Sequence, residues 1–162
     1  MAEFVSPRAL PGARDQLVLL VAYSCAIENG DAHLKNFAVL YDSPEREVRL
    51  APAYDILSTT PYIPRDTLAL TLNGTKSFPM RDSLTSFMKK VTGKSERAIL
   101  EMLDRVAHGV SVAIDEARLY GRKHAAAARF AQRLEQVMTR GLDRLGYKPF
   151  STSPLTSSGR SA

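Results

Sequence analysis

The sequence predicts an α+β fold in which helix dominates and the strands form one small insert. Three observations predict it. An apolar run near the N-terminus is long enough for a buried helix, two short strand-like segments with a turn between them follow, and the second half carries two long amphipathic patterns. The expected order is therefore a helix, a small β-rich insert and then a bundle of helices.

The first helix is predicted within a mainly apolar stretch. Residues 1–13 hold two prolines and a glycine, so they are expected to form an irregular lead-in. Residues 14–28 then form the apolar run, and Asp15 in the first turn suits the positive end of the helix dipole. The turn signal Asn29-Gly30 is expected to stop this helix.

The β-rich insert follows at once. Residues 37–41 read as a strand, residues 42–45 as a turn, and residues 47–50 alternate polar and apolar side chains as a second strand. These segments predict a hairpin. Residues 67–72 predict one further short strand, which an Asn-Gly turn ends.

The second half is predicted to be helical. Asp82 is expected to cap a short helix over 83–91, and Ser95 a long one over 96–120, with Gly121 interrupting it. One face of the long helix is apolar. Its residues are Ile99, Leu103, Val106, Val110 and Ile114.

A last helix is expected over about 123–145, ended by Gly146, and a similar apolar pattern runs through it. That pattern contains Phe130, Leu134, Val137 and Leu145. The tail, 149–162, is rich in Ser and Thr and is expected to be disordered. The folded domain is thus predicted to span residues 14–148.

Length and composition narrow the class of protein. The chain has 162 residues, of which 44% are hydrophobic and 24% charged, which fits one globular domain or a large fragment of one. No apolar run approaches the roughly 18 residues of a membrane span. The sole cysteine, Cys25, excludes a disulfide framework, and the sequence shows no secretory signal, so a cytoplasmic setting is expected.

The net charge of +5 is uneven, because residues 1–80 hold seven basic and nine acidic side chains, whereas residues 81–148 hold fourteen and eight. A basic half can face nucleic acid or an acidic partner. It carries no aromatic interleaving and no nucleic-acid motif, so a solvated helix surface is favoured and direct nucleic-acid binding is not expected.

Polar residues crowd between the first helix and the first strand. Asp31 and Asn36 lie five residues apart on a loop, and Asp55 follows nineteen residues later, just after the second strand. This is the layout of a protein-kinase catalytic centre, in which one aspartate receives the substrate hydroxyl proton while an asparagine and a second aspartate hold magnesium. Carboxylate and amide oxygens are hard ligands that suit Mg²⁺.

The exact sequence of these segments is more specific than the general kinase pattern. N-G-D-A-H-L-K-N-F, L-A-P-A-Y-D-I-L-S-T and L-A-L-T-L-N-G-T-K, which begin at residues 29, 50 and 68, closely resemble the HipA family of bacterial serine/threonine kinases. These kinases are the toxin halves of toxin–antitoxin pairs. The resemblance covers roughly residues 15–148 and implies a kinase-like C-lobe.

The resemblance implies a role for each loop residue. Asp31 would be the catalytic base, and Asn36 and Asp55 would bind Mg²⁺ and, through it, ATP. His33 and Lys35 would shape the site or neutralise the transferring phosphate. Tyr54 and Pro52 would fix the turn that presents Asp55. The implied partners are a DNA-binding antitoxin and a protein substrate of the translation machinery.

The chain departs from the family upstream of Asp31. Only 30 residues precede that aspartate, and they contain neither a Gly-rich nucleotide loop nor a strand lysine. We therefore expect the C-terminal portion of a kinase, whether as a fragment, a split-gene product or a remnant, which is inactive without an N-lobe. The alternative is a non-catalytic module that binds an antitoxin or a partner chain.

Other polar residues of the sequence have simpler interpretations. His108 and His124 fall within predicted helices and are most simply surface or packing residues. Lys76 is expected to be a loop charge, with a contact to substrate as the minor alternative. No second histidine or cysteine stands at ligand spacing from His33, which argues against a transition-metal site.

Overall fold

A computed structural model describes residues 12–43 and 47–147 and confirms the mostly helical α+β fold. Its helices are α1 (Ala13–Ala26), α2 (Arg81–Thr92), α3 (Glu96–Lys123) and α4 (Ala128–Arg144), and its strands are β1 (Val39–Leu40) and β2 (Arg49–Leu50). Two short 3₁₀ turns, Leu34–Asn36 and Ala125–Ala127, complete the elements. Most of the predicted lead-in, the centre of the hairpin turn and the Ser/Thr-rich tail lie outside the described residues.

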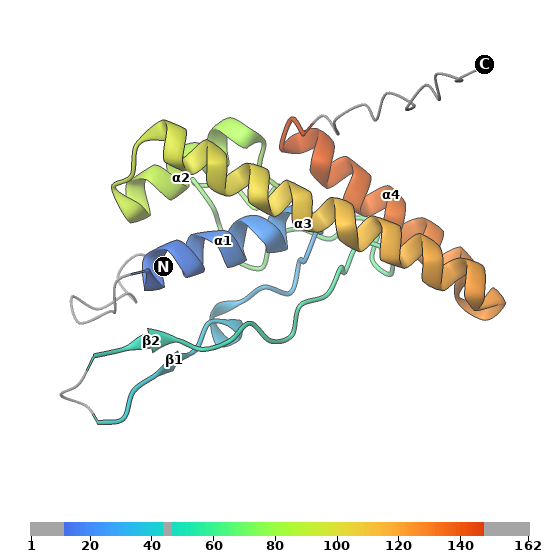
Figure 1. Ribbon diagram of the computed structural model, residues 1–162, viewed down its shortest axis with the longest axis horizontal. Coiled ribbons are helices and arrows are strands. Elements are labelled where there is room, and N and C mark those ends of the chain that lie inside the picture. Colours follow the sequence, from blue (N-terminus) through green and yellow to red (C-terminus); the bar gives the residue numbers. More distant parts are fainter. Residues whose placement is uncertain (1–11, 44–46, 148–162) are drawn as a thin grey trace, which may run out of the picture.

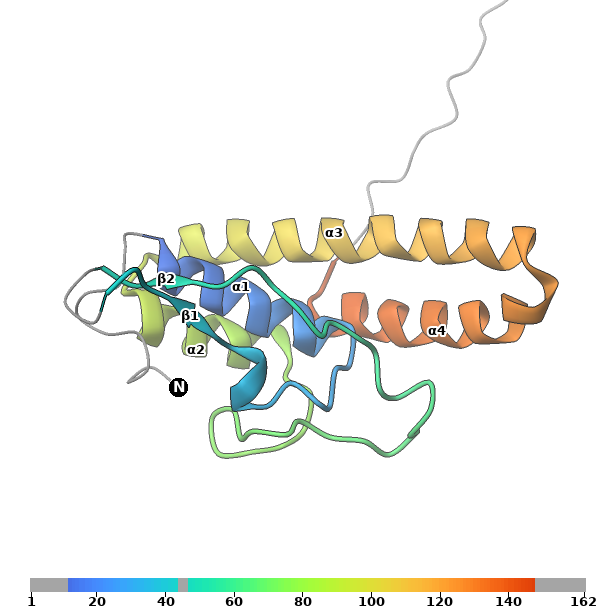
Figure 2. The same ribbon diagram turned by 90° about the horizontal axis from the view of Figure 1, so that it is seen from below.

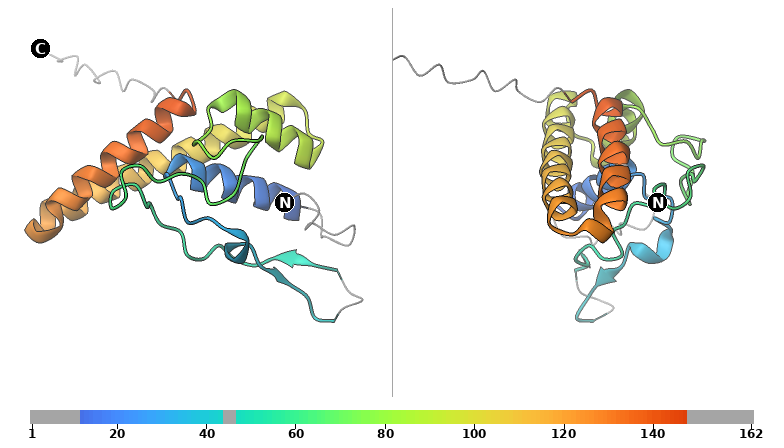
Figure 3. Two further views of the ribbon diagram at one scale, coloured as in Figure 1. Left: turned by 180° about the vertical axis from the view of Figure 1, so that it is seen from behind. Right: turned by 90° about the vertical axis from the view of Figure 1, so that its right-hand side faces the viewer.

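The helices form one layered bundle with the hairpin beside it. Helices α3 and α4 run antiparallel along each other (Figure 2), and α1 lies between this pair and the hairpin (Figures 1 and 3). No helix in the described part of the chain is long and apolar enough to cross a membrane.

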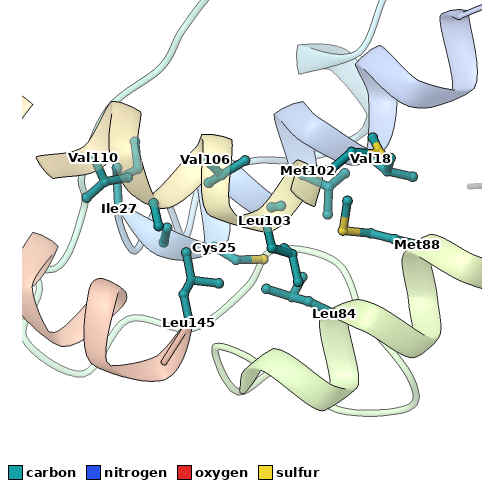
Figure 4. Close-up of a cluster of buried hydrophobic side chains, with 14 of the residues drawn as sticks. Val18, Cys25, Ile27, Leu84, Met88, Met102, Leu103, Val106, Val110 and Leu145 are labelled. Carbon is teal, nitrogen blue, oxygen red and sulfur yellow. The ribbon is translucent and has the colours of Figure 1, made fainter. Parts of the chain in front are cut away.

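The core sits where α1, α2, α3 and the end of α4 meet. Figure 4 shows side chains from all four helical regions pointing toward one another. Leu84 and Met88 of α2 pack opposite Leu103 of α3, and Leu145 after α4 closes the cluster. Each of these four residues is at most 1% exposed, so any shortening of them leaves a cavity.

Helix α1 starts one residue before its predicted start, and its last helical residue is Ala26, two residues before the predicted end. The predicted stop at Asn29-Gly30 was slightly misplaced. The residue that leaves the helical conformation for the left-handed region is Glu28, with a φ of 55°. Left-handed backbone is unusual for a residue other than glycine or asparagine, so specific contacts must hold Glu28 there.

Helix α3 begins as predicted, because the side chain of Ser95 accepts a hydrogen bond from the backbone N–H of Ala98. All five predicted core residues of its apolar face are buried. The predicted interruption at Gly121 was wrong, since α3 continues to Lys123. A Cβ atom at Gly121 would lie 2.7 Å from the Cβ of Ala131, so this glycine permits close packing of α3 against α4.

Helix α4 begins later than predicted, at Ala128, and ends as predicted just before Gly146, whose φ is 64°. Gly141 faces the end of α1, where an added Cβ would lie 1.8 Å from the carbonyl oxygen of Ala26. The two helices therefore touch through backbone at this point.

Helix α2 differs from its prediction at the start. Asp82 does not cap it, because the N-cap is Met80 and Asp82 lies inside the first turn. Arg81 instead ties the helix to the rest of the bundle, donating to the carbonyl of Leu145 over 2.6 Å and pairing with Asp104 at 2.8 Å.

The hairpin was predicted correctly in kind, although its strands are shorter. Val39 pairs with Leu50 and Leu40 with Arg49 in an antiparallel ladder. The further strand predicted over 67–72 is wrong. In the described part of the chain, Leu72 at the end of that segment forms an isolated bridge with Thr75 across the Asn-Gly turn. The sequence of the segment alternates between apolar and other side chains because Leu68 and Leu72 face the core.

Candidate active site

The loop after α1 presents Asp31 through a series of short hydrogen bonds. The backbone N–H of Asn29 donates to the carbonyl of Ser24 over 2.8 Å, and the side-chain oxygen of Asn29 accepts the N–H of Asp31 over 3.0 Å. The N–H of His33 then donates to the carbonyl of Asp31 over 2.7 Å. Buried Asn29 thus fixes the backbone of Asp31, whose side chain is exposed to solvent.

Asn36 joins this loop to the segment after the hairpin. Its side-chain oxygen accepts the N–H of His33 over 3.0 Å, and its amide nitrogen donates to the carboxylate of Asp55 over 2.6 Å. Asn36 is buried, and both of these bonds are partly shielded from solvent. Asp55 is itself exposed and adopts a left-handed backbone with a φ of 55°.

Tyr54 supports the turn that presents Asp55. Its hydroxyl donates a hydrogen bond to the carbonyl of Lys35, one residue before Asn36. The two segments are therefore joined twice, through neighbouring residue pairs. Pro52, which was expected to help, lies nearby in the chain and is exposed.

The segment after Asp55 returns along the start of the loop. Thr59 accepts the N–H of Gly30 over 2.9 Å, and both its N–H and its hydroxyl donate to the carbonyl of Glu28, over 3.2 and 3.1 Å. The hydroxyl of Ser58 donates to the carbonyl of Ile27. A side chain at Gly30 would collide with Asp66, which explains the glycine beside Asp31.

The other two candidate residues occupy different surroundings. Lys35 is exposed on the 3₁₀ turn, and His33 is half-buried at its start. The Nδ1 atom of His33 is buried and has no hydrogen-bond partner among the described residues. The structure thus joins Asn36 to Asp55 and links His33 to both Asp31 and Asn36 through backbone, while Lys35 takes part through its carbonyl alone.

Glu28 lies directly before the loop and was not among the residues predicted from the sequence. Its carboxylate is buried and receives hydrogen bonds from Arg140, over 3.2 and 2.9 Å, from Arg144, over 2.8 Å, and from the hydroxyl of Thr60. Burial, the largest single influence, raises the pKa of Glu28, but the hydrogen bonds from these three side chains and the charge of Arg144 together outweigh it, so the pKa lies below that of an ordinary glutamate. The one signal in the sequence is an acid at the end of an apolar helix, and its two arginine partners lie more than a hundred residues further along the chain.

The donor atoms at the junction of the two segments fit a hard cation. The carboxylate of Asp55 is exposed to solvent and adjoins Asn36, whose amide nitrogen faces it while the amide oxygen accepts the N–H of His33. Mg²⁺ binds through one or two carboxylates and retains waters and phosphate oxygens as its other ligands. Asn36 and Asp55 carry oxygen atoms that could hold Mg²⁺, next to the loop that presents the exposed side chain of Asp31.

Comparisons with known proteins agree with this fold. The family model described as the HipA-like C-terminal domain matches residues 1–114. Two proteins of Sinorhizobium fredii (strain NBRC 101917 / NGR234) are similar in sequence. "Putative kinase Y4dM" is 38% identical over 90 residues, covering 53% of this chain and 21% of that protein, and "Putative kinase Y4mE" is 46% identical over 52 residues, covering 31% and 12%.

A solved structure gives the same fold. The matching chain belongs to the complex of HipA, HipB and operator DNA from the Shewanella oneidensis MR-1 toxin–antitoxin system, with a TM-score of 0.65 and 22% identity. The match covers 83% of this chain and 32% of that one. The chain therefore spans about a third of the length of its structural relative and about a fifth of the Y4dM kinase.

Proposed function

The chain belongs to the HipA-like C-terminal domain family, and we propose that it supplies the catalytic face of an ATP-dependent serine/threonine protein kinase of the toxin type. The observation that carries the proposal is the 2.6 Å hydrogen bond between Asn36 and Asp55. It brings a D-x-x-x-x-N loop and a second aspartate, nineteen residues apart, to one edge of the fold.

Asp31 accepts the proton of the attacking hydroxyl group in this proposal. Its carboxylate is exposed, and its backbone is fixed on both sides by Asn29 and His33, so it is positioned without being desolvated. Asn36 and Asp55 hold Mg²⁺, which when bound supplies charge neutralisation to the ATP phosphates. Lys35, exposed on the same loop, adds a positive charge near the transferring group, and His33 maintains the loop.

The complete kinase requires more than these residues. The chain spans only 32% of the HipA chain it resembles, and the family description places it at the C-terminal end of such proteins. We propose that a further part, in the same or another chain, covers the ATP. An antitoxin like the HipB in the Shewanella complex is the corresponding proposed partner.

The second candidate function is a non-catalytic module that binds a partner chain. The observation that favours it is that several large apolar side chains of the segment after the hairpin are exposed, among them Tyr54, Ile56, Leu57 and Ile63. Exposed apolar patches mark interaction surfaces. This module would use the kinase-like fold to hold an antitoxin or a partner chain.

Calorimetric titration with ATP and Mg²⁺ separates the two functions. The wild-type chain is compared with Asp55→Ala and with the matched control Asp42→Ala. The control removes an exposed aspartate that follows β1 and lies in the hairpin turn, away from Asn36 in the chain. Magnesium-dependent binding that disappears in Asp55→Ala and persists in Asp42→Ala supports the kinase. Absence of binding by the wild-type chain, even when a covering partner is added, favours the binding module.

A further inference from the structure

A buried ion-pair cluster connects the last helix to the start of the loop that bears Asp31. Glu28 is the acid of this cluster, Arg140 and Arg144 are its bases, and Thr60 adds a hydroxyl donor. We call these four residues the Glu28 clasp. The side chain of Glu28 is only 5% exposed, whereas that of Arg140 is 53% exposed and reaches the acid from the surface.

The clasp holds a backbone conformation that the residue itself does not favour. Glu28 has a φ of 55°, in the left-handed region that glycine adopts far more readily. Its carboxylate accepts hydrogen bonds from three side chains, and its carbonyl accepts two from Thr59. The cost of the left-handed backbone is thus offset by contacts that come from α4 and from the segment after Asp55.

Asn29 and Gly30, which follow Glu28, connect its backbone to the candidate site. Asn29 holds the N–H of Asp31, and Gly30 donates to Thr59. Thr59 in turn lies four residues after Asp55. The position of Glu28 therefore sets where the Asp31 loop meets the segment that carries Asp55.

We infer that the Glu28 clasp is a positioning device, through which Arg140 and Arg144 of α4 hold Asp31 and Asp55 in register. The inference rests on the function proposed above. Among the described residues, neither arginine hydrogen-bonds to a candidate catalytic or metal-binding side chain, so both are positioning residues. Helix α4 lies beyond the 1–114 match to the family model, so the helix that sets the site's geometry is not part of the matched segment.

The alternative is that the clasp only attaches α4 to the bundle. The ion pair between Arg118 and Glu135, at 2.7 Å, provides the comparison, because it joins α3 to α4 away from the loop. Glu135→Gln removes the carboxylate that pairs α4 with α3 and leaves the residues of the candidate site unchanged. Loss of either the Arg118–Glu135 pair or the clasp would loosen the attachment of α4. Only loss of the clasp would displace the Asp31 loop relative to Asp55.

Amide hydrogen exchange, followed by NMR on the full chain, tests the inference. The variants are Glu28→Gly, Glu28→Gln and Arg140→Gln, with Glu135→Gln as the control. Glu28→Gly removes the carboxylate and also relieves the left-handed backbone, so it tests whether the carboxylate contacts hold the loop once that backbone is no longer unfavourable. The reporters are the amides of Gly30 and Thr59, and the side-chain amide of Asn36, which donates to Asp55.

We expect Glu28→Gly to accelerate exchange at Gly30 and Thr59 by about tenfold or more, since removing one partner of a buried ion pair is strongly destabilising. Glu28→Gln should give a smaller acceleration, because its amide oxygen still accepts hydrogen bonds. The Asn36 side-chain resonance should shift in the same order, and the amide of Leu103 in the core of α3 should be unaffected. Glu135→Gln should leave all the loop reporters unchanged.

Unchanged exchange at Gly30 and Thr59 in Glu28→Gly, or equal effects in Glu135→Gln, would overturn the inference. If Glu28→Gly fails to fold, Arg140→Gln decides by the same reporters, because Arg144 still neutralises Glu28 in that variant. Affinity for Mg²⁺–ATP is measured in parallel and should fall with the Asn36 shift; normal affinity despite lost protection would also overturn it. A wild-type chain that binds no Mg²⁺–ATP would count against the proposed function, while the exchange data would still decide on the clasp.

Discussion

The side-chain amide of Asn36 donates a 2.6 Å hydrogen bond to the carboxylate of Asp55, although a complete β-hairpin separates them in the chain. The hairpin returns the chain to the point where it left the loop, and the bond between Tyr54 and the carbonyl of Lys35 secures the return. Two oxygen-bearing side chains thereby adjoin at the edge of the fold that also presents Asp31.

Asp31→Asn is predicted to slow phosphoryl transfer without weakening ATP binding. General-base catalysis contributes about 10²–10⁴-fold to such reactions, so a loss on the order of 10³-fold is expected in the complete kinase. The fold should persist, because Asp31 is exposed and its structural contacts run through its backbone. Transfer of labelled γ-phosphate to the substrate protein measures the effect, and a wild-type rate would remove Asp31 from the base role.

Asp55→Asn is predicted to weaken the magnesium-dependent binding of ATP, the step that precedes phosphoryl transfer. Replacing a carboxylate oxygen by an amide weakens a Mg²⁺ site, so the magnesium-dependent part of ATP affinity should fall and transfer should be abolished. Titration of ATP at several Mg²⁺ concentrations measures this, with Asp42→Asn as the control. If the mutant retained wild-type affinity at every Mg²⁺ concentration, Asp55 would not be a metal ligand.

Gly141→Ala and Gly109→Ala should have opposite effects on stability. An added Cβ at Gly141 would lie 1.8 Å from the carbonyl oxygen of Ala26, so α1 and α4 must separate, at a cost of about 1–3 kcal/mol. Gly109 lies in α3 with nothing within 4 Å of the added atom, so alanine there should stabilise by roughly 0.5–1 kcal/mol. Urea unfolding of both variants decides, and a Gly141→Ala variant as stable as wild type or more stable would contradict the close contact.

The stability that Glu28 contributes should depend on pH in a defined direction. Its pKa in the folded chain lies below the 4.5 of an unperturbed glutamate, because the hydrogen bonds from Arg140, Thr60 and Arg144 outweigh the effect of burial. Its contribution is therefore fully present above pH 4.5 and is lost as the pH falls through the lower, folded value.

Comparison with Glu28→Gln measures this contribution. The difference in unfolding free energy between wild type and variant should be constant from about pH 6 to about pH 8 and should shrink in acid. A difference that grows on acidification would mean that the pKa of Glu28 is raised in the folded chain. Glu135→Gln, at an exposed pair, should show a much weaker dependence.

Elements with a strong local signal were predictable from the sequence. Helix α3 begins at its Ser95 cap and buries the predicted apolar face, because both features depend on residues within a few turns of each other. The strand predicted over 67–72 failed because alternation reports which side chains face the core, not whether a partner strand exists. Gly121 was misread as a break because its real neighbour, Ala131, is set by the packing of two helices.

The candidate site also contains residues that local sequence predicts and one residue, Glu28, that it does not. Motif spacing predicted that the Asp31 loop and Asp55 would meet, and Asn36 makes that contact, while the catalytic and metal-binding roles of these residues stay predictions. Glu28 could not be identified from sequence. Its partners, Arg140 and Arg144, are 112 and 116 residues away, and no local pattern links a helix-terminal acid to two arginines of a distant helix.

The length of that separation also orders events during protein synthesis. Arg144 is translated 116 residues after Glu28, which at roughly 5–20 residues per second is a delay on the order of ten seconds. The loop and the hairpin are made early in that interval, whereas the arginines that complete the clasp are made only at its end. A nascent chain can therefore form the hydrogen bonds between Asn36 and Asp55 and between Tyr54 and Lys35 first, but it cannot complete the clasp until α4 has left the ribosome.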